Sequence, residues 1–186
     1  MKDDFKFLAN YYDKVIHAQS NFMWSEVIDR VESDILLDVG GGTGRIIRQL
    51  SHKFKRPIIC DFSLPMLKIA KSKGHLNEIC CNSEYLPFES NSKKIVIMVD
   101  TLHHLVEPKK TLFEILRVLT KDGVFILEEP NIEKWQIKII SLIEKLFHMQ
   151  SRFYNYADII EMINIPGIEI TPIYLGNNFS LVINYS

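Results

Sequence analysis

The sequence has little cysteine, no excess of charge of either sign and no long uninterrupted apolar run. Its three cysteines, Cys60, Cys80 and Cys81, lack metal-ligand and redox spacing, so we expect buried apolar residues and no metal site. Twenty-two Lys and Arg against 23 Asp and Glu give a net charge of -1, so no overall field favours nucleic acid or an anionic membrane. Without a membrane span or the apolar core of a signal peptide, the expectation is a cytoplasmic protein.

Length and composition indicate one globular domain. The 186 residues are 47% hydrophobic and 24% charged, which is ordinary for a folded chain with a single core. No repeat or linker divides the sequence. We expect one domain over 1–186, with an N-terminal helical cap at 1–33, a central core at 34–131, and C-terminal helices with a β-hairpin at 132–186.

Short apolar runs rich in β-branched residues alternate with segments of helical periodicity. Because the runs are apolar on both faces, they predict parallel strands covered by helices, an α/β doubly wound sheet. The five predicted parallel strands are Ile35–Val39, Pro57–Asp61, Glu78–Cys81, Lys94–Asp100 and Gly123–Glu129.

The helices are predicted between and around these strands. They are expected at 3–17, 22–31, from the glycine-rich segment past Leu50, and at 64–73, 108–119, 133–148 and 157–163. Two final runs, 168–175 and 179–185, are separated by Gly176, Asn177 and Asn178, which accept positive φ and therefore predict an antiparallel hairpin. Its second strand should insert antiparallel, giving about seven strands in all.

A glycine loop joins the first predicted strand to the following helix. Gly40, Gly42 and Gly44 alternate there, so a ligand can approach the backbone closely and meet several amides. A dinucleotide fingerprint G-x-G-x-x-G fails, because Arg45 or Ile47 occupies the third glycine position. An NAD-dependent oxidoreductase is therefore the weaker alternative.

Two acidic residues accompany the loop. Asp38 leads it, and a carboxylate there would repel a pyrophosphate but suit a ligand that carries an ammonium and a sulfonium. Asp61 ends the second strand about twenty residues later, where it can accept bonds from both hydroxyls of a ribose. The alternative for Asp61 is that it caps the helix beginning near Leu64.

Three segments together carry a family resemblance: LLDVGGGTGRI, CDFSLPMLKIAK, and the stretch from NSEYLPFES through DTLHHL to FILEEPN. From about 12 to 131 the chain resembles the class I S-adenosylmethionine-dependent methyltransferases, and within them the ubiquinone and menaquinone C-methyltransferase branch. The resemblance implies a Rossmann-like fold, with S-adenosyl-L-methionine as methyl donor bound by the core at 34–131.

The resemblance also implies roles for single residues. Five residues would hold the methionine part of the donor: Asp38, Gly40, Gly41, Gly42 and Gly44. Asp61 would hold the ribose. The adenine would lie against Phe62 and Met66 and meet Asn82, where the family usually has Asp, and Ser83. Asp100, at the end of the fourth strand, would complete the donor site.

The methyl acceptor should bind beyond the strand ends, opposite the donor loop. The candidate acceptor-facing residues are Tyr11, Tyr12, His103, His104, Glu128, Glu129 and Asn131. His104 is the candidate general base, because imidazole titrates near neutral pH, with packing of the turn as its alternative. Aromatic residues after the fifth strand, such as Phe153 and Tyr154, favour helix packing over an apolar acceptor pocket.

The leading hypothesis is a methyltransferase that acts on a small molecule. A protein or RNA methyltransferase and a non-catalytic S-adenosylmethionine-binding protein are the alternatives within the same fold. The even charge and the lack of an added recognition domain disfavour a macromolecular acceptor. The sequence leaves the acceptor and the oligomeric state open.

Overall fold

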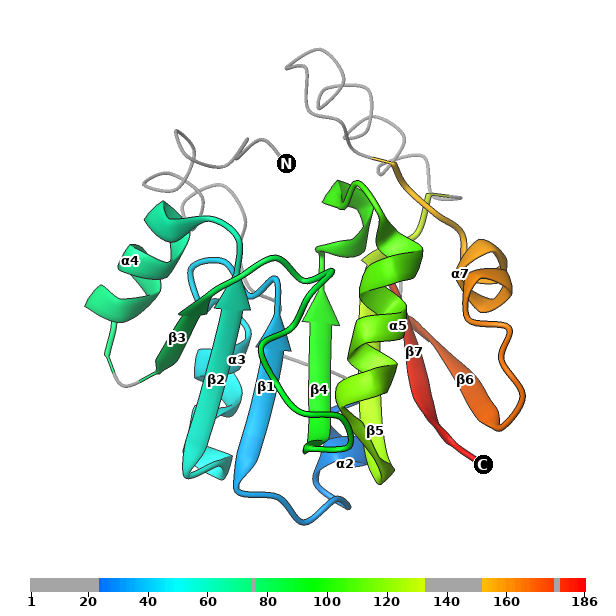
Figure 1. Ribbon diagram of the computed structural model, residues 1–186, viewed down its shortest axis with the longest axis horizontal. Helices are drawn as coiled ribbons and strands as arrows, with labels where there is room; N and C mark the ends of the chain where they lie inside the picture. Colours follow the sequence, from blue (N-terminus) through cyan, green and yellow to red (C-terminus); the bar gives the residue numbers. More distant parts are fainter. Residues whose placement is uncertain (1–23, 75, 133–151, 176–177) are drawn as a thin grey trace.

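The protein is described by a computed structural model that covers residues 24–74, 76–132, 152–175 and 178–186, built around one seven-stranded sheet (Figure 1). The strands are β1 (Ile35–Val39), β2 (Arg56–Asp61), β3 (Asn77–Cys80), β4 (Lys93–Val99), β5 (Leu119–Pro130), β6 (Ile168–Leu175) and β7 (Asn178–Tyr185). Their order across the sheet is β3-β2-β1-β4-β5-β7-β6.

The first five strands run parallel and the last two form an antiparallel hairpin. β1 pairs in parallel with both β2 and β4, while β7 lies antiparallel between β5 and β6. The α/β class, the seven strands and the antiparallel insertion of the second hairpin strand are therefore confirmed.

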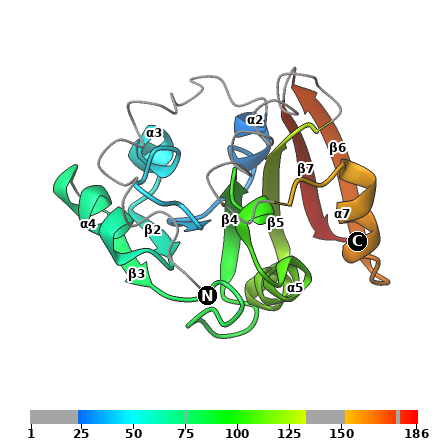
Figure 2. The ribbon, with the colours of Figure 1, turned by 90° about the horizontal axis from the view of Figure 1, so that it is seen from above.

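Helices cover both faces of this sheet, as the apolar strands require. They are α2 (Ser25–Ile28), α3 (Ile47–Leu50), α4 (Leu64–Ser72), α5 (Pro108–Val118) and α7 (Tyr156–Met162), with 3-10 turns η1 (Ser51–Lys53) and η2 (Leu102–His104). Figure 2 shows α2 and α3 on one side of the sheet and α5 on the other. Two apolar cores result, one with Leu112 and Phe125 at its centre and one with Trp24 and Ile97.

Local geometry shifts several predicted boundaries. The helix after the glycine loop begins only at Ile47, because Gly44 has φ +75° and cannot lie in a right-handed helix. β5 begins at Leu119, before the predicted Gly123, because Leu119 pairs with Lys93 while Val124 pairs with Ile95. The pairing register shifts between these two pairs, so the extra residues of β5 form an irregularity within the strand.

Other expectations fall outside the described residues, namely the helices at 3–17 and 133–148. Among the residues that are described, no helix is long and apolar enough to cross a membrane. The expectation of three buried cysteines is wrong for Cys80, which is exposed at the sheet edge, whereas Cys60 is buried and Cys81 half-buried.

Candidate active site

The carboxyl ends of the parallel strands meet at one edge of the sheet, where β1 and β4 lie side by side although β2 and β3 separate them in sequence. After β1 the chain continues into α3 on one face of the sheet, and after β4 it continues into α5 on the other (Figure 2). In open α/β sheets ligands bind beyond the strand ends at such a switch point, which we call the crevice between β1 and β4. Asp38, Asp61 and Asp100 all lie at or next to these strand ends. The sequence prediction that they belong to one site therefore matches the topology.

The glycine loop has the backbone that its residues imply. Gly40, Gly42 and Gly44 have φ of +75°, +57° and +75°, a region that side chains rarely adopt. A Cβ on Gly40 would lie 2.1 Å from Cγ2 of Thr101, whereas a Cβ on Gly42 would meet nothing within 4 Å in the part of the chain that the structure describes. Gly40 is thus needed for packing, and Gly42 lies against open space that a ligand can occupy.

Asp61 ties the end of β2 to the glycine loop. Its Oδ2 accepts a hydrogen bond of 2.8 Å from the amide of Gly42, and its Oδ1 accepts one of 2.7 Å from the amide of Ser63. The N-cap of α4 is Ser63, so Asp61 is not the cap of that helix, and the capping interpretation is wrong. The two bonds fix the carboxylate at the mouth of the crevice.

Asp38 is a buried carboxyl group. Only 1% of the residue is exposed, and its Oδ2 has no hydrogen-bond partner among the residues that the structure describes. Burial, reinforced by the nearby charge of Asp61, raises the pKa of Asp38 to about 7. A buried carboxylate is costly without a cationic partner, so a cation that binds beside Asp38 would favour its ionised form.

Asp100 faces the loop from the end of β4. It forms an ion pair of 2.8 Å with Arg45, and its φ of +51° is a strained conformation for a residue other than glycine. Burial raises the pKa of Asp100, and the Arg45 guanidinium opposes that rise. The ion pair bridges the crevice between β1 and β4.

The predicted adenine-side residues lie along the next strands. Phe62 is 39% exposed, whereas Met66 is buried in α4. The amide oxygen of Asn82 accepts a bond from the backbone of Glu84, and the Ser83 hydroxyl lies 3.1 Å from Oγ1 of Thr111. The two polar side chains thus order the loop after β3 in this structure.

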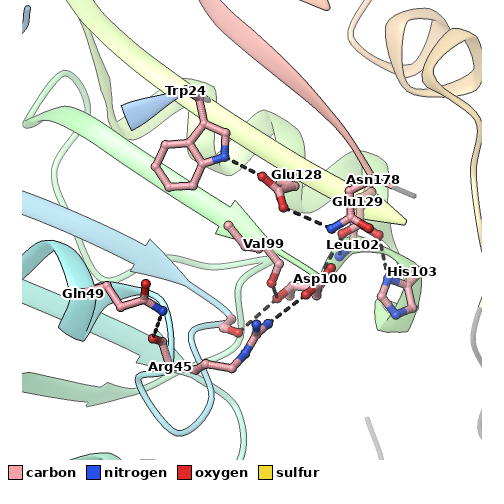
Figure 3. A network of polar contacts seen from close by, with 12 residues as sticks. Trp24, Arg45, Gln49, Val99, Asp100, Leu102, His103, Glu128, Glu129 and Asn178 are labelled. Atoms are coloured by element: carbon pink, nitrogen blue, oxygen red, sulfur yellow. Dashed lines mark hydrogen bonds and ion pairs between the residues drawn. The ribbon is translucent and has the colours of Figure 1, made fainter. Parts of the chain in front are cut away.

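The carboxylate of Glu129 binds the turn that follows β4 (Figure 3). Its Oε1 accepts bonds of 2.9 Å and 2.7 Å from the amides of Thr101 and Leu102, and its Oε2 lies 2.6 Å from Nδ1 of His103. The residue is 2% exposed. Because two backbone amides already donate to this carboxylate, we assign the proton of the third bond to Nδ1 of His103, which fixes the ring.

The two histidines therefore have different surroundings. His103 is stacked on Phe153 with ring centroids 4.6 Å apart, whereas burial and the neighbouring His103 hold the pKa of His104 well below its usual value. His104 thus stays neutral at pH 7 and is a weak base. Its role as general base stays a prediction, and the structure draws attention to His103 instead.

Glu128 faces away from its neighbour, because successive residues of a strand point to opposite faces. It accepts bonds from Nε1 of Trp24 at 2.5 Å, Nδ2 of Asn178 at 3.1 Å and Oγ of Ser180 at 3.1 Å. Glu128 thus joins α2 and β7 inside the core. Of the other acceptor candidates, Asn131 is buried just after β5, while Tyr11 and Tyr12 lie outside the described residues.

The comparisons with known proteins agree with this arrangement. A family model described as a methyltransferase domain matches residues 37–127, which contain the loop, Asp61 and the β4 turn. The chain is 31% identical to the demethylmenaquinone methyltransferase of Paenarthrobacter aurescens, over 59% of this chain and 46% of that enzyme. Residues 37–127 of this chain are a methyltransferase domain.

Other similar proteins match more of this methyltransferase. It is 29% identical to the uncharacterized protein MJ1252 of Methanocaldococcus jannaschii, over 91% of this chain and 76% of that protein. It also shares its fold, with a TM-score of 0.82 and 17% identity, with a chain in a complex that contains the Trm112 methyltransferase activator of Haloferax volcanii. That likeness covers 100% of this chain and 99% of the other.

Three contact residues of this methyltransferase are not among the predicted site residues. Arg45 follows the glycine loop, Thr101 packs on Gly40, and Phe153 stacks on His103. Arg45 and Thr101 lie within the motif segments LLDVGGGTGRI and DTLHHL, so only their proximity to the site could be expected. The contact of Phe153 depends on how the segment before α7 meets the turn after β4 in space.

Proposed function

We propose that this protein transfers the methyl group of S-adenosylmethionine to a small-molecule acceptor at the crevice between β1 and β4. The observation that carries the proposal concerns two neighbouring groups. Among the described residues, Oδ2 of the buried Asp38 has no hydrogen-bond partner, and Gly42, which is held by Asp61, faces open space. A ligand with an ammonium group, a carboxylate and a ribose matches these features. Their chemistry is complementary in charge and in hydrogen bonding.

Each end of the donor then has a group that suits it. Asp38 would face the ammonium of the methionine part. The guanidinium of Arg45 would lie beside the carboxylate of that part, because the amides of Gly40, Gly41, Gly42 and Gly44 already donate within the protein. Asp61 would accept bonds from the ribose hydroxyls, which is the geometry that its fixed position supports. Phe62, Met66, Asn82 and Ser83 would border the adenine.

Methyl transfer requires alignment more than acid–base chemistry. The bound donor supplies a methyl group that its sulfonium already activates, so the protein must hold the acceptor about 3 Å away and in line. Among the described residues, the acceptor side carries His103, His104 and Glu129. A histidine is needed as a base only if the nucleophile of the acceptor carries a proton that must be removed.

Calorimetric titration tests the donor site directly. S-adenosylmethionine and its product S-adenosylhomocysteine should bind, while NAD should not, because the third glycine of its fingerprint is missing. Tight binding of NAD with none of S-adenosylmethionine would overturn the proposal. Binding of the donor without methyl transfer in any acceptor screen would favour the non-catalytic alternative.

The acceptor can be sought with labelled donor. We propose starting from quinone-type acceptors such as demethylmenaquinone, because a relative that shares 31% identity carries that name. Protein and RNA fractions form the second arm of the screen. The net charge of -1 favours the small-molecule arm, since it provides no overall field that attracts nucleic acid.

We also propose that a partner subunit can complete the acceptor side. The support is the likeness to a chain in a complex that contains the Trm112 methyltransferase activator. Light scattering of the protein alone and after co-expression with a candidate activator from the same organism tests this. No complex, together with full activity of the chain alone, would contradict it.

A further inference from the structure

Glu129 binds three consecutive residues of one turn. Its carboxylate lies within 2.9 Å of the amide nitrogens of Thr101 and Leu102 and of Nδ1 of His103. A buried carboxylate is stable only where donors surround it, and these charge-assisted bonds are stronger than neutral ones. The end of β5 therefore determines where the turn after β4 lies.

Thr101 continues the contact to the glycine loop. Its hydroxyl lies 3.0 Å from the carbonyl oxygen of Gly40 and 3.0 Å from that of Val99. Its Cγ2 fills the space where a Cβ of Gly40 would stand, at 2.1 Å. Because no gap separates Thr101 from Gly40, a displacement of the turn also displaces the first glycine of the loop.

We propose that Glu129 is a positioning residue that couples the orientation of His103 to donor binding through Thr101. Glu129 is 2% exposed and its carboxylate faces the turn, so in this proposal it acts on donor and acceptor through the turn and not by direct contact. The inference rests on the donor site of the proposed function. Since coupling is reciprocal, bound donor should change the surroundings of His103, and loss of Glu129 should weaken donor binding.

The chain offers a matched control in the adjacent residue. Glu128 is also 2% exposed and also accepts three side-chain or backbone bonds, but its donors are Trp24, Asn178 and Ser180 on the other face of β5. A variant at this position disturbs a buried carboxylate of the same strand without touching the β4 turn. Any effect specific to Glu129 is therefore separable from general loss of stability.

The first measurement is the affinity for S-adenosylhomocysteine by calorimetry. Glu129→Ala should bind roughly tenfold more weakly, because two amides of the turn lose their acceptor. Glu129→Gln should bind within about threefold of the wild type, because the amide oxygen still accepts from both. Glu128→Gln should also stay within about threefold. If Glu129→Ala does not fold, Thr101→Val tests the same link, with an expected loss of about fivefold.

The second measurement is the ring N–H signal of His103 in proton–nitrogen spectra. A short bond to a carboxylate should give a strongly downfield resonance that disappears in Glu129→Gln and in His103→Ala and persists in Glu128→Gln. Saturating S-adenosylhomocysteine should shift it, which a purely structural Glu129 would not predict. A resonance that S-adenosylhomocysteine does not shift would overturn the coupling but not the proposed function. The same holds if Glu129→Ala and Thr101→Val both bind S-adenosylhomocysteine within twofold of the wild type. Wild-type protein that binds no donor would overturn the proposed function itself.

Discussion

The Asp61 carboxylate accepts a 2.8 Å hydrogen bond from the amide of Gly42, which lies 19 residues earlier in the chain. This bond joins the end of β2 to the loop after β1 and fixes their spacing before any ligand binds. Both residues belong to the proposed donor site. A site whose parts are already held in place loses less conformational freedom on binding, which favours affinity.

Replacement of Asp61 should weaken the donor site. Asp61→Ala removes the proposed ribose acceptor and the bond to Gly42, so the affinity for S-adenosylmethionine should fall by about 2 kcal/mol, roughly 30-fold. Asp61→Asn should lose less, because an amide oxygen can still accept from Gly42. Asp29→Ala, which breaks only an exposed ion pair with Lys53, is the control and should bind as the wild type does. Unchanged affinity in Asp61→Ala would refute the ribose assignment.

Gly42 allows a comparison in which backbone strain is matched. Gly42 and Gly167 both have positive φ, +57° and +83°, and neither would bring a Cβ closer than 3.9 Å to another atom. Gly42→Ala and Gly167→Ala should therefore cost similar stability, about 1 kcal/mol. Only Gly42→Ala should weaken donor binding, and Gly42→Val should abolish it. Thermal unfolding and calorimetry on the same samples check both statements, and equal donor affinities would contradict the loop's role.

Asp38 predicts a dependence of stability on pH. Its pKa is about 7 in the folded protein against 3.8 for an ordinary Asp, so the protonated form is favoured by folding. The stability that this group contributes is fully present below about pH 4, and it is lost as pH rises to about 7, by up to roughly 4 kcal/mol. Denaturant unfolding of the wild type should show this fall relative to Asp38→Asn. Parallel curves for the two proteins would refute the raised pKa.

The donor should reverse this effect. Its ammonium and sulfonium favour the ionised Asp38, so below about pH 7 donor binding should release a proton. Affinity should therefore rise with pH up to about 7 and change little above it. Calorimetry at pH 6 in buffers of different ionisation enthalpy measures the released proton. Asp38→Asn should release none, and a wild type that also releases none would place the ammonium elsewhere.

Much of this site follows from the order of residues along the chain. Asp38, the glycine loop and Asp61 lie at strand ends that periodicity alone identifies, and parallel pairing brings those ends to one edge. The hairpin prediction succeeded for a similar reason, since Gly176 and the two asparagines interrupt two apolar runs. The local order of residues determines the strand ends, the glycine loop and the hairpin, so these features can be predicted from one sequence.

The acceptor side could not be predicted in the same way. HHL and EEP each contain two similar neighbours, and only the register of β4 with β5 decides that Glu129 meets His103 while Glu128 meets Trp24. The register shift between Leu119 and Val124 sets this pairing, and it lies between the predicted helix at 108–119 and the predicted strand at 123–129. The catalytic role of His104 stays a prediction, and the contact of His103 with Glu129 could be found only from the tertiary structure.

The two histidines make a direct test of the division between donor and acceptor sides. His104→Ala should leave donor affinity unchanged, because His104 follows β4 on the acceptor side and its lowered pKa keeps it neutral at pH 7. His103→Ala should weaken folding, since it removes a donor from the buried Glu129. Once an acceptor is known, turnover can be measured. A positioned general base contributes about 10²- to 10⁴-fold to the rate, so a loss of that size in His104→Ala would indicate a catalytic role. A loss under about threefold would indicate that His104 only packs against the turn. If His104→Ala stays folded by circular dichroism yet donor affinity collapses, then His104 lies against the donor and the proposed division of the crevice is wrong.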